Sequence, residues 1–119
     1  MLPKKNRLDT KTVEQIWKEG RFVNSPNITF KFIKTKGETK VSFISPKTAS
    51  KSAVLRNLLR RRGYRAIEPY MSKLTGFTGA FVFGKKSLTQ FGAKGPKSKE
   101  MMKNLDQELK FIIDKLKNA

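Results

Sequence analysis

Arginine side chains recur on one side of a predicted helix near the middle of the chain. The segment reads KTASKSAVLRNLLRRRGYR from residue 47 to residue 65, and it contains no acid. On a helical projection one arc is apolar, and we expect it to be buried: Val54, Leu55, Leu58 and Leu59. The opposite arc is polar and carries Arg56, Asn57, Arg60 and Arg61. Because a guanidinium fork binds phosphate oxygens two at a time, the segment predicts binding to a phosphate backbone.

The net charge of the whole chain is strongly positive. Lys and Arg number 27 against 9 Asp and Glu, so the formal charge is +18 over 119 residues. Such an excess causes self-repulsion unless a polyanion neutralises it. A solvated charged face is the other interpretation of the basic segment, but a helix that only needs solubility usually mixes both signs. A nucleic acid is therefore the predicted partner.

Cysteine and histidine are both absent. Their absence excludes disulfides, thiol nucleophiles, histidine bases, and zinc sites with thiolate or imidazole ligands. We therefore predict neither catalytic residues nor a metal site in this chain. No apolar stretch approaches the roughly 20 residues that cross a bilayer, and the first residues lack the apolar core of a secretory signal. We expect a cytoplasmic protein with no membrane partner.

Alternating side chains predict a strand that starts at Asn27. Ile28, Phe30 and Phe32 fall on one face, and Thr29, Lys31 and Ile33 fall on the other. A helix capped by Asp9 or Thr10 and ending near Lys18 precedes this strand. After a turn at Lys36-Gly37, alternation resumes and stops at Pro46. Residues 27–45 are therefore predicted to form an antiparallel hairpin.

The second half of the chain predicts a break, a strand and a long helix. Gly63 and Pro69 indicate that the basic helix bends or stops, since an unbroken helix would turn Arg62 toward its apolar arc. A buried strand is predicted within residues 78–88 and a loop over 91–98. Ser98 then caps a final helix with a core-facing stripe: Met101, Met102, Leu105, Leu109, Ile112, Ile113 and Leu116.

These elements predict one α+β domain over residues 1–119, a sandwich with helices on one face of a small sheet. The other face would then be exposed beside the basic helix. Unpaired nucleotides bind such surfaces by stacking on aromatic rings. Four aromatics are candidates, and core packing is the alternative for each of them: Trp17, Phe22, Phe30 and Phe32.

Short motifs along nearly the whole chain resemble the protein subunit of bacterial ribonuclease P. The resemblance runs from Asn6-Arg7-Leu8 through Ile16–Gly20, Ser25-Pro26 and Val41-Ser42-Phe43, and it ends with Phe81-Val82-Phe83 and the closing helix. It is clearest in the segment from Lys51 to Asn57 followed by Leu59-Arg60-Arg61, which looks like the Arg-Asn-Arg helix of that family.

The resemblance implies a two-layer α/β sandwich around a four-stranded sheet with a left-handed crossover, similar to the second domain of ribosomal protein S5. It also implies an accessory subunit of the endoribonuclease that removes the 5′ leader of precursor tRNA. The partners would be ribonuclease P RNA, with one protein per RNA, and precursor tRNA. Catalysis would belong to the RNA, which would hold most of the Mg²⁺.

The resemblance implies that Arg56, Asn57, Arg60 and Arg61 stand at RNA- and metal-proximal positions of the family, and that Trp17 and Lys31 stand at positions of its leader cleft. The predicted RNA-binding set is Lys47, Lys51, Arg56, Asn57, Arg60, Arg61 and Arg65, and the predicted leader-binding set is Trp17, Lys31 and Arg60. Three departures from the family pattern stand out: Leu58 in place of the second Arg of Arg-Asn-Arg, Ser45-Pro46-Lys47-Thr48 in place of Val-Ser-Lys-Lys, and Val13 in place of Phe. Leu58 lies in the apolar arc, so we expect it to be core.

Other functions remain open at this stage. A basic ribosomal or other RNA-binding protein, with no role in tRNA cleavage, would use the same surfaces. A self-sufficient enzyme would need paired carboxylates, and only Asp106, Glu108 and Asp114 cluster, on the final helix where a solvated face is expected. Those acids also argue against the remaining alternative, a membrane-surface protein with an amphipathic end.

Overall fold

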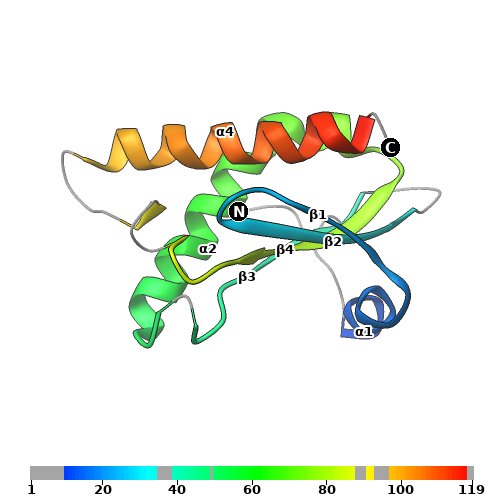
Figure 1. The fold of residues 1–119 in the computed structure, drawn as a ribbon, viewed down its shortest axis with the longest axis horizontal. Helices are drawn as coiled ribbons and strands as arrows, with labels where there is room; N and C mark the ends of the chain where they lie inside the picture. Colours follow the sequence, from blue (N-terminus) through cyan, green and yellow to red (C-terminus); the bar gives the residue numbers. More distant parts are fainter. Residues whose placement is uncertain (1–9, 35–38, 49, 88–90, 93–96, 118–119) are drawn as a thin grey trace.

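Four strands form one mixed sheet with the order β1-β2-β4-β3 (Figure 1). The computed structural model describes residues 10–34, 39–48, 50–87, 91–92 and 97–117. Its elements, in chain order, are α1 (Thr10–Glu19), β1 (Arg21–Asn24), β2 (Ile28–Lys34), β3 (Val41–Ile44), α2 (Ala53–Ile67), the 3-10 helix η2 (Glu68–Leu74), β4 (Phe77–Phe83) and α4 (Ser98–Lys117). The predicted α+β class and the four-stranded sheet are confirmed.

The predicted hairpin over residues 27–45 is wrong. Strand β4 lies between β2 and β3: Phe81 pairs with Phe30 in an antiparallel ladder and with Phe43 in a parallel one. Alternation identified both strands but could not identify their partner, which follows much later in the chain. The connection from β3 through α2 and η2 to β4 is therefore a crossover, and its left hand stays a prediction. The predicted Lys36-Gly37 turn lies outside the described residues.

Phenylalanine rings fill the centre of the core. The ring centroids of Phe30 and Phe81 are 4.2 Å apart, and those of Phe43 and Phe81 are 4.8 Å apart, both in stacked geometry. Phe30 and Phe32 are buried in this cluster, as are apolar residues of α2 and of α4. Two of the four candidate aromatics are therefore core residues and leave the proposed stacking set.

The helices lie on both sides of the sheet, so the expectation of helices on one face is wrong for α1. In Figure 1, α4 lies above the sheet and α1 lies below it. Ile16 and Ala80 are fully buried yet stand outside the main core cluster, and α1 contacts β2 and β4. We call the α1 side of the sheet, which carries Thr29, Lys31 and Ile33, the outer face.

Helix α2 passes the β3 edge of the sheet obliquely. Its N-terminal turns lie on the same side as α1, and its C-terminal turns approach α4 (Figure 1). The helix begins at Ala53, where Ser52 Oγ accepts a hydrogen bond of 3.3 Å from the N–H of Leu55. Residues 47–48 form a turn, so the helix predicted from residue 47 starts too early.

The buried stripe of α2 is rotated relative to the predicted one. Leu59, Gly63, Ala66 and Ile67 are buried. Val54 is 63% exposed, and Leu55 and Leu58 are only half-buried, so the expectation of a core Leu58 is wrong. The side chain of Val13, the other apolar departure from the family pattern, lies outside what the structure describes.

Gly63 packs inside a continuous helix and does not break it. A Cβ at this position would lie 2.6 Å from Cε1 of Phe43, so the glycine allows the helix to approach the ring closely. The helix ends only at Ile67, and Pro69 stands at the start of η2, as the predicted break requires. Arg62 does turn inward, where it donates a hydrogen bond to the carbonyl of Phe91, and burial lowers its pKa.

Candidate nucleic-acid interface

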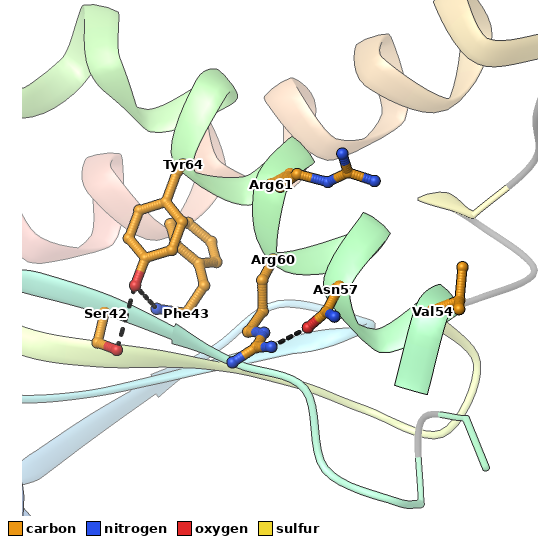
Figure 2. A pocket seen from close by; sticks show the side chains of 7 residues that line it. All are labelled: Ser42, Phe43, Val54, Asn57, Arg60, Arg61 and Tyr64. Carbon is orange, nitrogen blue, oxygen red and sulfur yellow. Dashed lines mark hydrogen bonds between the residues drawn. The ribbon is translucent and has the colours of Figure 1, made fainter. Parts of the chain in front are cut away.

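A groove of about 560 Å³ lies between α2 and the edge strand β3 (Figure 2). Its lining combines polar strand and helix residues with one exposed valine: Ser42, Phe43, Val54, Asn57, Arg60, Arg61 and Tyr64. Three of the predicted RNA-binding residues, Asn57, Arg60 and Arg61, therefore meet in one surface feature. The exposure of Val54, which the helical projection did not predict, belongs to the same groove.

Tyr64 joins α2 to the edge of the sheet. Its hydroxyl oxygen accepts a hydrogen bond of 3.3 Å from the N–H of Phe43 and lies 3.4 Å from Oγ of Ser42. Its ring meets Phe43 edge-on, with centroids 5.2 Å apart. Sequence reasoning missed both Tyr64 and Ser42. The available signal was the spacing of four residues between Arg60 and Tyr64, which places them on one side of a helix.

Arg60 and Arg61 point in different directions although they are adjacent. Arg60 extends toward β3 and donates a hydrogen bond to Oδ1 of Asn57, whereas Arg61 extends away from the strand (Figure 2). Both side chains are exposed. The amide of Asn57 therefore holds the Arg60 guanidinium over the groove. The Arg61 guanidinium lies on the side of α2 that faces away from β3, which we call the outer flank of α2.

Arg56 has a different environment from the other arginines. It is half-buried, and its Nη1 donates to the carbonyls of Ser50 at 2.9 Å and Lys51 at 3.1 Å. This side chain ties the preceding loop to α2. The loop itself forms a hollow of about 720 Å³ that is lined by Lys47, Thr48, Ser50 and Lys51, so the two predicted lysines lie together.

The remaining predicted cation, Arg65, lies one turn beyond Arg61. These two arginines, with Tyr64 and Glu68, line a further hollow of about 410 Å³. Arg61 thus borders this hollow and the α2–β3 groove. The seven predicted RNA-binding residues form a band from the loop, along the groove, to the outer flank of α2. We call this set the cationic band.

The structure brings Trp17 and Lys31 into contact on the outer face. Nζ of Lys31 lies 4.7 Å from the ring centroid of Trp17, and the indole is 46% exposed. Helix α1 ends close to the sheet because Gly20 follows it: a Cβ there would lie 3.1 Å from the carbonyl oxygen of Phe32 and against that of Ile16. Trp17 is therefore held beside the sheet with its ring accessible.

One row of strand residues connects the two regions. Lys31 pairs with Ala80 of β4, and Ala80 pairs with Ser42 of β3, whose Oγ lies 3.4 Å from the hydroxyl of Tyr64. Adjacent strands are about 4.8 Å apart, so the row covers roughly 10 Å between Lys31 and Ser42. Arg60, the third predicted leader-binding residue, is therefore separated from Trp17 and Lys31 by β4.

The acids of α4 form structural contacts, so the expectation of a solvated acidic face is wrong for two of them. Glu108 accepts hydrogen bonds of 2.7 Å from Ser25 Oγ and from the N–H of Asn27. Asp106 accepts one of 2.6 Å from the hydroxyl of Tyr70. Glu108 therefore holds the turn between β1 and β2, and Asp106 holds η2. Within the described ranges, no three His, Cys, Asp or Glu residues are grouped to hold a metal ion.

The family model described as Ribonuclease P matches residues 2–116 of the chain. The chain belongs to the ribonuclease P family. Family membership makes it the protein component of the holoenzyme that processes the 5′ end of tRNA, and it implies association with ribonuclease P RNA. The resemblance seen in the sequence is confirmed, and ribonuclease P is favoured over a general ribosomal RNA-binding role. No curated protein matches the chain.

Solved structures of ribonuclease P proteins share the fold at low sequence identity. The protein from Thermotoga maritima has a TM-score of 0.75 and 17% identity, covering 92% of this chain and 96% of that one. The protein from Staphylococcus aureus has a TM-score of 0.72 and 15% identity, covering 94% and 95%. A mutant of the latter with defective mRNA degradation activity has a TM-score of 0.76 and 14% identity, covering 96% and 90%.

Along the described part of the chain, no helix is both long and apolar enough to span a bilayer.

Proposed function

We propose that the outer face of the sheet binds the single-stranded 5′ leader of precursor tRNA, while the cationic band binds ribonuclease P RNA. The observation that carries this proposal is the row from Lys31 through Ala80 to Ser42, which ends at Tyr64. It places the Trp17–Lys31 pair and the groove beneath Arg60 along one path across the sheet. A leader that follows this path would meet an aromatic ring at one end and a guanidinium at the other.

The chemistry of the two ends suits an unpaired RNA strand. Stacking on an aromatic ring contributes about 1 to 3 kcal/mol of binding free energy per base, whichever base it is, because every base has a π face. Lys31 already lies over the indole, so its ammonium group is close to where a backbone phosphate would run. Arg60 is held in place by Asn57 and presents a planar fork to a second phosphate.

The cationic band suits a larger RNA partner. It extends along the loop and α2 without an acid in the first turn of the helix, so the positive end of the helix dipole is not neutralised there. Arg56 is engaged by backbone carbonyls, and we therefore assign it to shaping the band. The exposed members, Arg60, Arg61 and Arg65 with the two loop lysines, would contact phosphates.

In this proposal the RNA subunit performs the cleavage. Mg²⁺ ions, held mainly by that RNA, would activate water and stabilise the leaving oxygen. The described residues of the protein offer no cluster of ligands for such an ion, so no step is assigned to a protein-bound metal. The proposal also includes one protein per RNA, a single RNA-binding domain over residues 1–119, and a cytoplasmic location.

Reconstitution with ribonuclease P RNA tests the proposal. The holoenzyme is expected to bind precursor tRNA more tightly than mature tRNA, and Trp17→Ala should remove most of that difference while assembly with the RNA subunit persists. The protein alone should leave precursor tRNA intact. Equal affinity of the wild-type holoenzyme for the two tRNA forms would refute leader binding. If a folded Trp17→Ala variant failed to assemble with the RNA, Trp17 would instead belong to the contact with ribonuclease P RNA.

A further inference from the structure

Phe22 is an exposed aromatic that the proposed function does not use. It lies on the edge strand β1 and is 64% exposed. Its cross-strand partner is Lys31, so the phenyl ring and the lysine side chain emerge on the same face of the sheet. Four large apolar side chains are exposed in the described part of the chain: Trp17, Phe22, Val54 and Phe111. Two of the four flank one lysine.

Lys31 is the centre of this arrangement. On one side its Nζ lies 4.7 Å from the ring centroid of Trp17. On the other side Phe22 stands directly opposite it across the β1–β2 ladder, where Cβ atoms are about 4.5 to 5.5 Å apart. Single exposed apolar residues are common and need no explanation. A cation between two exposed rings is instead the composition of surfaces that bind unpaired nucleotides.

We propose that Phe22 is a second base-stacking residue, which extends the leader-binding surface from Lys31 to the β1 edge. Two different leader nucleotides would stack, one on Trp17 and one on Phe22, and Lys31 would bind the backbone between them. This inference rests on the proposed function, because it assumes that the leader crosses the outer face. It adds a contact at the side of the sheet opposite α2.

Hydrogen bonds with α4 and packing on the core fix the backbone that carries Phe22. Glu108 holds the turn after β1 through hydrogen bonds from Ser25 and Asn27, and Lys115 Nζ lies 3.4 Å from the carbonyl oxygen of Asn24. The neighbouring Val23 packs against the core. The ring is thus presented on an ordered strand, which reduces the entropy lost when a base binds.

The β1 edge is poorly suited to pairing with another protein strand. It is only four residues long, it begins with Arg21, and Lys115 occupies the outward carbonyl of Asn24. Short edges with cations are the usual protection against strand addition. The net charge of +18 also favours a polyanion over a second copy of this chain. A single-stranded RNA segment is therefore the occupant that these features support.

An abasic scan of the leader in the reconstituted holoenzyme tests the inference. Each leader nucleotide is replaced in turn by an abasic linker, and the affinity is measured for wild type, Phe22→Ala, Phe22→Tyr and Trp17→Ala. Stacking of one base corresponds to roughly 5- to 150-fold in affinity. We expect two sensitive positions in the wild type. Phe22→Ala should lose the sensitivity at one of them only, Trp17→Ala at the other, and Phe22→Tyr should keep both.

Phe111→Ala is the matched control, since Phe111 is also an exposed ring with a lysine Nζ 4.5 Å from its centroid, but on α4. It should keep the wild-type scan. A Phe22→Ala scan identical to wild type would overturn the inference and leave leader binding standing. Equal losses by Phe22→Ala for precursor and mature tRNA would also overturn it. A wild-type scan without any sensitive position would refute base stacking on the outer face, whereas equal affinity for precursor and mature tRNA would refute leader binding itself.

Discussion

The backbone N–H of Phe43 donates a hydrogen bond of 3.3 Å to the hydroxyl oxygen of Tyr64, so a side chain of α2 covers the free edge of β3. This contact fixes the distance between the helix that carries Arg60 and the strand that forms the other wall of the groove. The hydrogen bond and the ring packing therefore set the width of the groove, and neither contact uses the exposed side chains of Arg60 and Arg61.

Tyr64→Phe should destabilise the protein modestly. The substitution keeps the edge-on packing of the ring against Phe43 and removes only the hydroxyl, so we expect a loss of about 0.5 to 1.5 kcal/mol in the free energy of unfolding. Urea denaturation measures this. Ser42→Ala removes the second polar neighbour of Tyr64 and should cost less, because the Phe43 bond remains. Unchanged stability in Tyr64→Phe would show that this bond contributes nothing.

Substitution of three adjacent arginines, Arg60, Arg61 and Arg62, should distinguish a loss of RNA contacts from a loss of stability. Arg60→Ala combined with Arg61→Ala should flatten the slope of log K against log salt for binding to the RNA subunit, by roughly 0.7 to 0.9 per lost phosphate contact. Arg62→Ala is the control, because Arg62 turns inward to the carbonyl of Phe91. It should keep the wild-type slope and lower the free energy of unfolding by about 1.5 to 3 kcal/mol. The opposite pattern would exchange the roles of the two faces.

Side-chain periodicity predicted individual elements better than their partners. Phe30 and Phe32 alternate with Lys31, so the faces of β2 were predictable from the sequence. The position of β4 between β2 and β3 was not, because pairing depends on residues far apart in the chain. Strand β1 was missed altogether, since the four residues of an exposed edge strand carry no alternating pattern.

The same limit applied to the candidate site, where residue types could be predicted from the sequence and tertiary partners could not. A basic face was predictable, because Arg60 and Arg61 fall with Arg56 on one side of a helix. The buried side of the helix was misjudged because Val54, Leu55 and Leu58 were expected to form it. In the structure Val54 lines the groove, and Arg62 turns inward, where the carbonyl of Phe91 accepts its hydrogen bond. Tyr64 could not be assigned, because its role depends on the N–H of an edge strand whose position only the tertiary structure shows.

Gly63→Ala should destabilise the protein although alanine favours helices. The helix propensity gained is about 1 kcal/mol, while overpacking costs about 1 to 3 kcal/mol. The second term should dominate, because the new Cβ would lie 2.6 Å from Cε1 of Phe43, and this ring is itself stacked on Phe81. The loss should largely disappear on a Phe43→Leu background, measured as a double-mutant cycle. A stabilised Gly63→Ala single variant would contradict this packing.

Tyr70 should make stability depend on pH in the alkaline range. Its hydroxyl donates a hydrogen bond of 2.6 Å to Asp106, and this bond, burial and the charges of Asp106 and Asp114 raise the pKa of Tyr70. Because the folded pKa exceeds the unfolded value of about 10, the stabilisation is complete below pH 10 and is lost as pH rises through the folded pKa. The difference in unfolding free energy between wild type and Tyr70→Phe should therefore be constant near neutral pH and shrink above pH 10. Asp106→Asn removes the main cause of the raised pKa, so its ultraviolet titration should show tyrosine ionising at lower pH. A difference between wild type and Tyr70→Phe that grows with pH would contradict the assigned direction.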